Sequence, residues 1–180
     1  MHLMIDLETL SLANNAVVMQ IGWATFDPKE MGGVIDSGAF SMNAKEQMEV
    51  KGRELSYETF QWWMRQSDDA RTKLVNRVSM DTMPEILDAF TAHFEWVNIE
   101  GVWANGILFD LAILVNLFDQ YDRSVPWHYR SPRDFKTLRA LRPNIQGPKP
   151  AIAHSAEHDA IAQAIQVQNI FYSLLNETGA

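Results

Sequence analysis

Two acidic residues stand inside an alternating apolar segment at the start of the chain. Asp6 and Glu8 are two residues apart, so in a β-strand both side chains point to the same face. The apolar residues of the segment point to the other face: Leu3, Ile5 and Leu7. Neighbouring carboxylates repel each other and lose hydration, and a hard cation such as Mg²⁺ or Mn²⁺ relieves both costs. Alternatively, Asp6 ends an edge strand and Glu8 caps the next element, so the segment suggests a metal site without requiring one.

Two further acidic residues lie more than a hundred residues downstream. Asp110 follows the short apolar segment 101–105 and stands in the first turn of an expected helix, where the helix dipole favours a carboxylate. This is also an ordinary position for an acidic residue. Asp159 lies inside the otherwise apolar face of the last expected helix, and His154 stands five residues before it. A carboxylate in that apolar setting calls for a function.

Together these residues resemble the three sequence motifs of the DEDDh family of 3′→5′ exonucleases. The motifs are Asp6-x-Glu8-Thr9, Asn105-x-x-x-Phe109-Asp110 and His154-x-Ala156-x-x-Asp159-Ala160. Each is weak alone, but the three match the family's order and spacing and span nearly the whole chain. Three further segments resemble the DexA-type phage exodeoxyribonucleases: Thr59-Phe60-Gln61-Trp62-Trp63, Gln66-Ser67-x-x-Ala70-Arg71 and Arg133-Asp134. Small bacterial exoribonucleases with the same core are a close alternative.

The resemblance implies an active site with two divalent ions, Mg²⁺ or Mn²⁺. Four carboxylates hold them in this interpretation: Asp6, Glu8, Asp110 and Asp159. Two ions about 3.5–4 Å apart stabilise both the attacking and the leaving oxygens of a phosphodiester displacement. The expected reaction is 3′→5′ hydrolysis of single-stranded nucleic acid, DNA being favoured over RNA, with release of nucleoside 5′-monophosphates. The alternatives are an exoribonuclease and a non-catalytic protein that binds nucleic-acid ends, although a pure binder gains nothing from mutually repelling carboxylates.

The general base implied by the resemblance is His154. In the family pattern the base stands five residues before the last aspartate, which selects His154 over His158. His158 is adjacent to Asp159, but neighbouring residues of a helix point about 100° apart. An imidazole titrates near the working pH, as proton transfer from water requires.

Six residues are expected to contact the substrate: Thr9, Leu10, Asn105, Phe109, Trp63 and Arg133. In the family, residues directly after the first motif often wedge against the terminal base. Trp62 and Trp63 could stack on bases, but adjacent helical residues face different ways, so at least one of them should enter the core. Ser11, Asn14 and Asn15 of the following loop are candidate partners for the terminal sugar.

Length and composition suit a single domain, and the resemblance implies that it is an exonuclease domain covering residues 1–180 without accessory modules. Of the 180 residues, 47% are hydrophobic, which is enough for a sizeable core. No apolar run reaches the length of a membrane span, and no basic signal-peptide region opens the chain. The absence of cysteine excludes disulfides, thiolate metal sites and a cysteine nucleophile. We therefore expect a cytoplasmic protein without a membrane partner; its oligomeric state is open, a homodimer being one option.

The net charge of −8 argues at first against a nucleic-acid partner. The objection weakens if several carboxylates are metal ligands, because bound cations invert the local field. Six basic residues also crowd into twenty positions: Arg130, Arg133, Lys136, Arg139, Arg142 and Lys149. Those from 133 to 142 share one helical face, which either follows a phosphate backbone or is simply solvated.

Strands and helices alternate in an order typical of a ribonuclease H-like architecture. Three antiparallel strands are expected at residues 1–10, 17–26 and 34–42, and two further strands at 101–105 and 125–129. Helices are expected at 57–66, 67–75, 111–121, 134–141 and 156–175. Another opens at the capping box Thr82-Met83-Pro84-Glu85, with Ile86, Leu87, Phe90, Phe94 and Val97 on its apolar face. We therefore predict an α/β fold: a ribonuclease H-like mixed five-stranded sheet flanked by helices.

Overall fold

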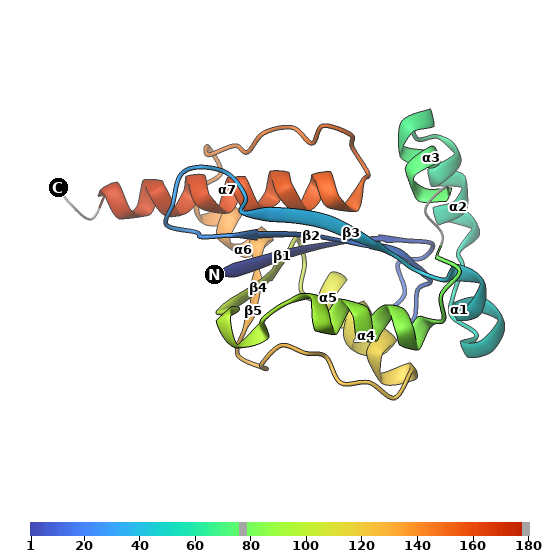
Figure 1. Ribbon diagram of the computed structural model, residues 1–180. Helices are drawn as coiled ribbons and strands as arrows, with labels where there is room; N and C mark the ends of the chain where they lie inside the picture. The colour runs from blue at the N-terminus through green and yellow to red at the C-terminus, as the bar shows by residue number, and fades with distance from the viewer. Residues whose placement is uncertain (76–78, 178–180) are drawn as a thin grey trace.

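The computed structural model describes residues 1–75 and 79–177, and a five-stranded sheet forms its centre (Figure 1). The strands are β1 (His2–Thr9), β2 (Val18–Phe26), β3 (Asp36–Ser41), β4 (Gly101–Ala104) and β5 (Pro132–Asp134), in the spatial order β3-β2-β1-β4-β5. The first three run antiparallel, whereas β4 pairs in parallel with β1, and β5 in parallel with β4. The predicted mixed five-stranded sheet is confirmed.

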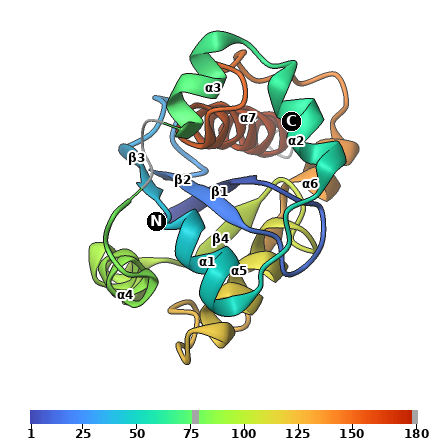
Figure 2. The same cartoon turned by 90° about the vertical axis from the view of Figure 1, so that its right-hand side faces the viewer.

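Helices cover both faces and one end of the sheet. They are α1 (Ala44–Lys51), α2 (Tyr57–Met64), α3 (Asp68–Val75), α4 (Met83–His93), η1 (Trp96–Asn98), α5 (Asp110–Gln120), α6 (Phe135–Leu141) and α7 (Ala156–Glu177). The long helix α7 and the short α6 lie on one face, and α4 and α5 lie on the other (Figure 1). Helices α1–α3 gather at the end of the sheet where α7 begins (Figures 1 and 2). Within the described residues, no helix is long and apolar enough to cross a membrane.

The alternation along β1 divides its side chains between the two helical layers. Three of them are buried with α4 and α5: Leu3, Ile5 and Leu7. Met4 is buried with α7 on the opposite face. Asp6 and Glu8 follow Met4 with period 2, so both carboxylates lie on the face that α7 covers, as the sequence pattern predicts.

Helix α1 has no counterpart in the sequence prediction. Its sequence is largely polar, with Asn43 as N-cap and Gly52, at φ 61°, as the left-handed C-cap. Its anchor is the buried Gln47, whose side-chain amide donates to the Val18 carbonyl and accepts from the Val18 N–H. Because a glutamine takes the place of an apolar anchor, hydrophobic periodicity does not reveal this helix.

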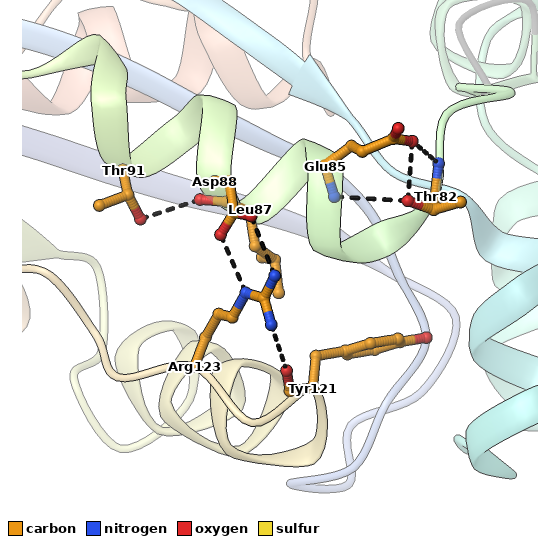
Figure 3. Close-up of polar contacts among 7 residues, drawn as sticks. All are labelled: Thr82, Glu85, Leu87, Asp88, Thr91, Tyr121 and Arg123. Atoms are coloured by element: carbon orange, nitrogen blue, oxygen red, sulfur yellow. Dashed lines mark hydrogen bonds and ion pairs between the residues drawn. The ribbon is translucent and has the colours of Figure 1, made fainter.

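Helix α4 begins at the predicted capping box, and Arg123 fastens it to the end of α5 (Figure 3). Thr82 and Glu85 cap each other's backbone N–H groups, and Arg123 donates to both carboxylate oxygens of Asp88 at 2.9 Å. The helix ends before Val97 because the backbone becomes extended at its C-cap. Val97 instead lies in η1 and is 93% exposed, so its predicted place on the buried face is wrong.

The last strand lies later in the chain than predicted. Residues 125–129 do not join the sheet, because Val125 and Trp127 pack in the core that α4 and α5 cover. The edge strand β5 begins instead at Pro132, and an edge strand tolerates proline because one of its sides has no ladder hydrogen bonds to donate. The prediction of a strand at 125–129 is therefore wrong: the apolar residues there reflect core packing, not strand pairing.

Helix α7 makes backbone contact with the sheet at Gly22 of β2. A Cβ atom added to Gly22 would lie 2.0 Å from the carbonyl carbon of Ala156, the first residue of α7. Only glycine permits such an approach of two backbones. Gly22 also pairs with Asp6 across β1 and β2, so this contact brings the first turn of α7 next to the Asp6 carboxylate.

We expect Gly22→Ala to lower the free energy of unfolding by about 1–3 kcal/mol or more, because a methyl group cannot occupy the space of a backbone carbonyl. Urea unfolding followed by circular dichroism measures the change. The matched control is Gly32→Ala, since a Cβ at Gly32 would meet no atom within 4 Å. Equal stability of the two variants would contradict the direct docking of α7 on β2.

Candidate active site

Four carboxylates meet where the C-terminal ends of β1 and β4 lie next to the first turn of α7. β1 supplies Asp6 and Glu8, and the first turn of α7 supplies Asp159; one oxygen of each lies within 4.8 Å of the other two. Asp110 begins α5, after the loop that follows β4, and lines the same cleft as the other three carboxylates. The structure therefore brings together all four acidic residues that the sequence motifs single out.

Burial and mutual repulsion favour the protonated form of these carboxyls. Burial is the main reason that the pKa of Asp6 lies well above its usual value, followed by the charges of Asp110 and Glu8. Burial, and then the charge of Asp159, raises the pKa of Glu8 to about 8. Burial also raises the pKa of Asp110 to about 6, although backbone hydrogen bonds oppose it. Converging oxygens that disfavour their own ionisation fit a hard divalent cation, whose charge would replace the protons.

Gln163 is a residue of the site that sequence patterns do not single out. It lies on α7 one turn after Asp159, and its Nε2 donates to Oδ1 of Asp6 at 2.8 Å. This hydrogen bond favours the ionised form of Asp6, against the effect of burial, and fixes the orientation of a ligand oxygen. The available signal is the i, i+4 spacing from Asp159, which places both side chains on one helical face.

His154 lines the same cleft as the carboxylates. The cleft has a volume of about 320 Å³, and Asn105 and Phe109 line it as well. His154 adopts φ 59°, a left-handed conformation that is uncommon for a residue with a side chain, and its ring packs edge-on against Trp62 with 4.7 Å between the ring centroids. His158, the competing histidine, lines a separate cavity of about 200 Å³ beneath residues 148–151.

An apolar cavity adjoins the carboxylate cleft. Its volume is about 410 Å³, and it shares Leu7, Glu8 and Phe109 with the cleft. The other lining residues come from the end of β1, from the loop after it and from α2: Thr9, Leu12, Glu58, Thr59, Trp62 and Trp63. Helix α2 lies near the start of α7 at this end of the sheet (Figure 2). Aromatic side chains thus stand next to an acidic cleft, an arrangement that suits a flat ligand with a charged group.

Four of the six residues predicted to contact a substrate line these cavities: Thr9, Trp63, Asn105 and Phe109. Leu10 does not, because it packs against the buried cluster that contains Trp63, and Leu12 lines the cavity wall instead. Arg133 lines neither cavity, because the carbonyl oxygens of Arg130 and Pro132 accept hydrogen bonds from its guanidinium. The structure therefore does not support a substrate contact for Leu10 or Arg133.

The two neighbouring tryptophans differ in exposure, as expected for adjacent helical residues. Trp63 is 4% exposed and donates its Nε1 to the Thr9 carbonyl at 2.9 Å, whereas Trp62 is 42% exposed. The loop residues considered as partners for a sugar lie elsewhere. Ser11 is buried and its hydroxyl donates to Glu54 at 2.6 Å, and Asn14 lines a different cavity beside α5.

The sheet order, the converging carboxylates and the adjoining histidine are consistent with the DEDDh-type 3′→5′ exonucleases that the sequence motifs resemble. The family model described as the 3′-5′ exoribonuclease Rv2179c-like domain matches residues 1–174. The chain belongs to this family, as the resemblance to 3′→5′ exonucleases predicts. No curated protein matches the chain in sequence.

Among the solved structures that are similar to this chain, two are exonucleases of low sequence identity. The zinc-ion-bound form of the E. coli ExoI–ssDNA complex has a TM-score of 0.57 and 17% identity, over 98% of this chain and 42% of the ExoI chain. Exonuclease X in complex with 5′-overhanging duplex DNA has a TM-score of 0.50 and 16% identity, over 100% of this chain and 94% of its own. The chain thus spans less than half of ExoI, and the likeness confirms the predicted ribonuclease H-like α/β fold.

The raised pKa values predict a pH-dependent stability for the metal-free protein. A carboxyl whose pKa is higher in the folded than in the unfolded chain binds more protons when folded. The free energy of unfolding therefore falls as the pH rises from the ordinary pKa of Glu8, 4.5, to its raised value of about 8. In EDTA, Glu8→Gln should lose less stability over this range than the parent protein, as thermal melts at a series of pH values will measure.

The effect of added metal on stability should have the opposite pH dependence. Saturating Mn²⁺ should raise the melting temperature more at the alkaline end of this range, because the ligand carboxyls must be ionised to bind it. Glu30→Gln, which removes an exposed glutamate outside the cluster, is the matched control. If Glu8→Gln retained the pH dependence of the parent protein, the buried acidic cluster would not be its cause.

Proposed function

We propose that the protein is a divalent-metal-dependent 3′→5′ exonuclease that releases nucleoside 5′-monophosphates from single-stranded ends. The observation that carries this proposal is the convergence of four carboxylates beside His154 in a cleft that adjoins an apolar cavity. The direction of digestion comes from the family to which the chain belongs. The carboxylates are Asp6, Glu8, Asp110 and Asp159.

These four carboxylates are proposed to hold two divalent ions, Mg²⁺ or Mn²⁺. When bound, such ions supply positive charge next to the attacking and leaving oxygens of a phosphodiester. Backbone groups orient the carboxylates in advance: Asp110 Oδ2 accepts from the Gly106 N–H at 3.2 Å, and Asp159 Oδ2 accepts from the Ser155 N–H at 3.1 Å. Together with the Gln163 contact to Asp6, these bonds preorganise the ligand oxygens before substrate arrives.

His154 is proposed to act as the general base. Its imidazole lines the cleft, and its contact with Trp62 limits the positions that the ring can take. The ring accepts a proton from the water whose oxygen attacks phosphorus. As the bond between phosphorus and the 3′-oxygen breaks, the leaving oxygen takes a proton from solvent. The products are a strand with a new 3′-hydroxyl and a nucleoside 5′-monophosphate.

The apolar cavity is proposed to receive the terminal nucleotide. Its volume of about 410 Å³ lies in the range of pockets that hold one small ligand, and nucleobases stack on aromatic side chains such as Trp62. Phe109 lines both the cavity and the cleft, so a base on one side of it lies next to a phosphate on the other. A base must leave its stack to enter, which favours single-stranded ends.

Ribonucleotide ends are proposed as the preferred substrate. The exoribonuclease family model matches residues 1–174, whereas the DexA-like features that favour DNA are short motifs. Polar residues on the cavity wall, among them Thr9 and Thr59, are the candidates to pair with a 2′-hydroxyl. A non-catalytic end-binding protein is disfavoured because four mutually repelling carboxylates would only destabilise it.

His154→Ala should slow the chemical step by about 10²–10⁴-fold, the usual contribution of general acid–base catalysis. His158→Ala is the matched control, because His158 is next to Asp159 in the sequence but lines a different cavity. It should retain most of the activity. Single-turnover digestion of an oligonucleotide labelled at its 5′ end measures both variants, and the reverse order of severity would contradict the choice of base.

RNA and DNA oligonucleotides of one sequence, each labelled at the 5′ end, test the proposed function as a whole. We expect shortening from the 3′ end only in the presence of Mg²⁺ or Mn²⁺. RNA should be digested faster than DNA, and a single strand faster than a blunt duplex. Asp6→Asn should abolish digestion of every substrate. Faster digestion of DNA would reverse the sugar preference, and no digestion of either would contradict exonuclease function.

A further inference from the structure

Lys136 brings a positive charge to the acidic cleft. The six basic residues between positions 130 and 149 all lie in the described part of the chain, and Lys136 alone among them lines the cleft. Its Nζ lies 3.6 Å from the position that a Cβ of Gly106 would occupy. Its charge opposes the rise in the pKa of Asp110 that burial causes. The ammonium group therefore stands on the wall formed by the loop between β4 and α5.

The other basic residues of this stretch have different surroundings. Arg133 donates to the backbone carbonyls of Arg130 and Pro132, and the guanidinium of Arg139 lies 5.3 Å from the centre of the Phe135 ring. Lys149 lines the separate cavity beneath residues 148–151. The stretch is therefore not a continuous phosphate track along one helical face, and Lys136 has a distinct position.

Hydrogen bonds fasten the first turn of α6, and with it Lys136, to the loop after β4. Asp134 Oδ1 accepts from both the N–H and the hydroxyl of Thr137 at 2.7 Å, and Asp134 Oδ2 accepts from the Ile107 N–H at 3.1 Å. The Lys136 N–H donates to the Asn105 carbonyl at 3.3 Å. The backbone of Lys136 is thus tied to the wall of the cleft, and only its side chain is free to adjust.

The ammonium of Lys136 does not pair with the acidic cluster. Within residues 1–75 and 79–177, the salt bridges of 4.0 Å or less do not include Lys136. A lysine that neutralised the cluster itself would contact its carboxylates directly. A cationic group that faces the cluster across open space is suited to an anion that binds between them.

We propose that Lys136 binds a non-bridging oxygen of the scissile phosphate, an inference that rests on the exonuclease function proposed above. Four carboxylates and two divalent ions balance in charge, so a phosphodiester adds one negative charge that they leave uncompensated. Lys136 supplies the matching positive charge from the side of Asp110 and Gly106. The contact is a charge-assisted hydrogen bond from an ammonium to a phosphate oxygen.

Binding of a short single-stranded RNA tests this role, with Ca²⁺ in place of Mg²⁺ to slow hydrolysis. Lys136→Gln should bind about 10- to 100-fold more weakly, as expected for a lost hydrogen bond between charged groups. The slope of log K against log salt concentration should become shallower by about 0.7, the value for one phosphate contact on a single strand. Lys136→Arg should retain most of the affinity. Arg139→Gln, on the same helix but outside the cleft, is the matched control and should bind like the parent protein.

A methylphosphonate at the last linkage of the RNA, which removes the charge of that phosphate, locates the contact. It should weaken binding to the parent protein more than binding to Lys136→Gln, because the variant has already lost one partner of that charge. Equal losses in the two proteins, or a Lys136→Gln that binds like Arg139→Gln, would overturn the role of Lys136 while the exonuclease function stands. A parent protein that neither binds nor digests RNA or DNA ends would overturn both.

Discussion

The first turn of α7 rests directly on the backbone of β2, because Gly22 has no side chain to hold the two apart. Gly22 is also the partner of Asp6 in the sheet, so α7 arrives beside the strand that carries the first two carboxylates. Helix α7 and the turn that precedes it then place three side chains at the cleft: His154, Asp159 and Gln163. A side chain at position 22 would increase the distance between the backbones of α7 and β2. Asp159 would then lie farther from Asp6, and the cluster of converging oxygens would be lost.

The acidic cluster opposes folding when no cation is bound, because burial and repulsion disfavour the charges of Asp6 and Glu8. Apolar packing on both sides of β1 offsets this cost. One face of the strand belongs to the cluster that includes Phe90 and Phe118, and the other to the cluster that includes Phe26 and Phe135. The strand is therefore held over its length, and its last residues can carry charges that would not be tolerated at the end of a weakly packed strand. Rigid placement of repelling oxygens is what a preorganised metal site requires.

Patterns within single elements predicted much of the fold, and the resemblance to the exonuclease motifs selected the four carboxylates. The alternation of β1 placed Asp6 and Glu8 together on the face opposite Leu3, Ile5 and Leu7, and the capping box located the start of α4. Contacts between distant elements had no comparable signal: Gly22 resembles any small strand residue, and Gln163 any polar residue of an amphipathic helix. Apolar character predicts burial but does not say which element provides it. Residues 125–129 have the pattern of a strand, yet Val125 and Trp127 pack in the core that α4 and α5 cover.

The most direct measurement is a crystal structure with Mn²⁺ and a single-stranded oligonucleotide whose last linkage resists hydrolysis, recorded at the manganese absorption edge. The proposed function predicts anomalous density among the oxygens of Asp6, Glu8 and Asp159. It also predicts the 3′-terminal base in the apolar cavity against Trp62, with the last phosphate between the cluster and Lys136. Manganese bound elsewhere, or a 3′ end that lies outside both cavities, would contradict the central claim that this acidic cleft is the active site of a metal-dependent exonuclease.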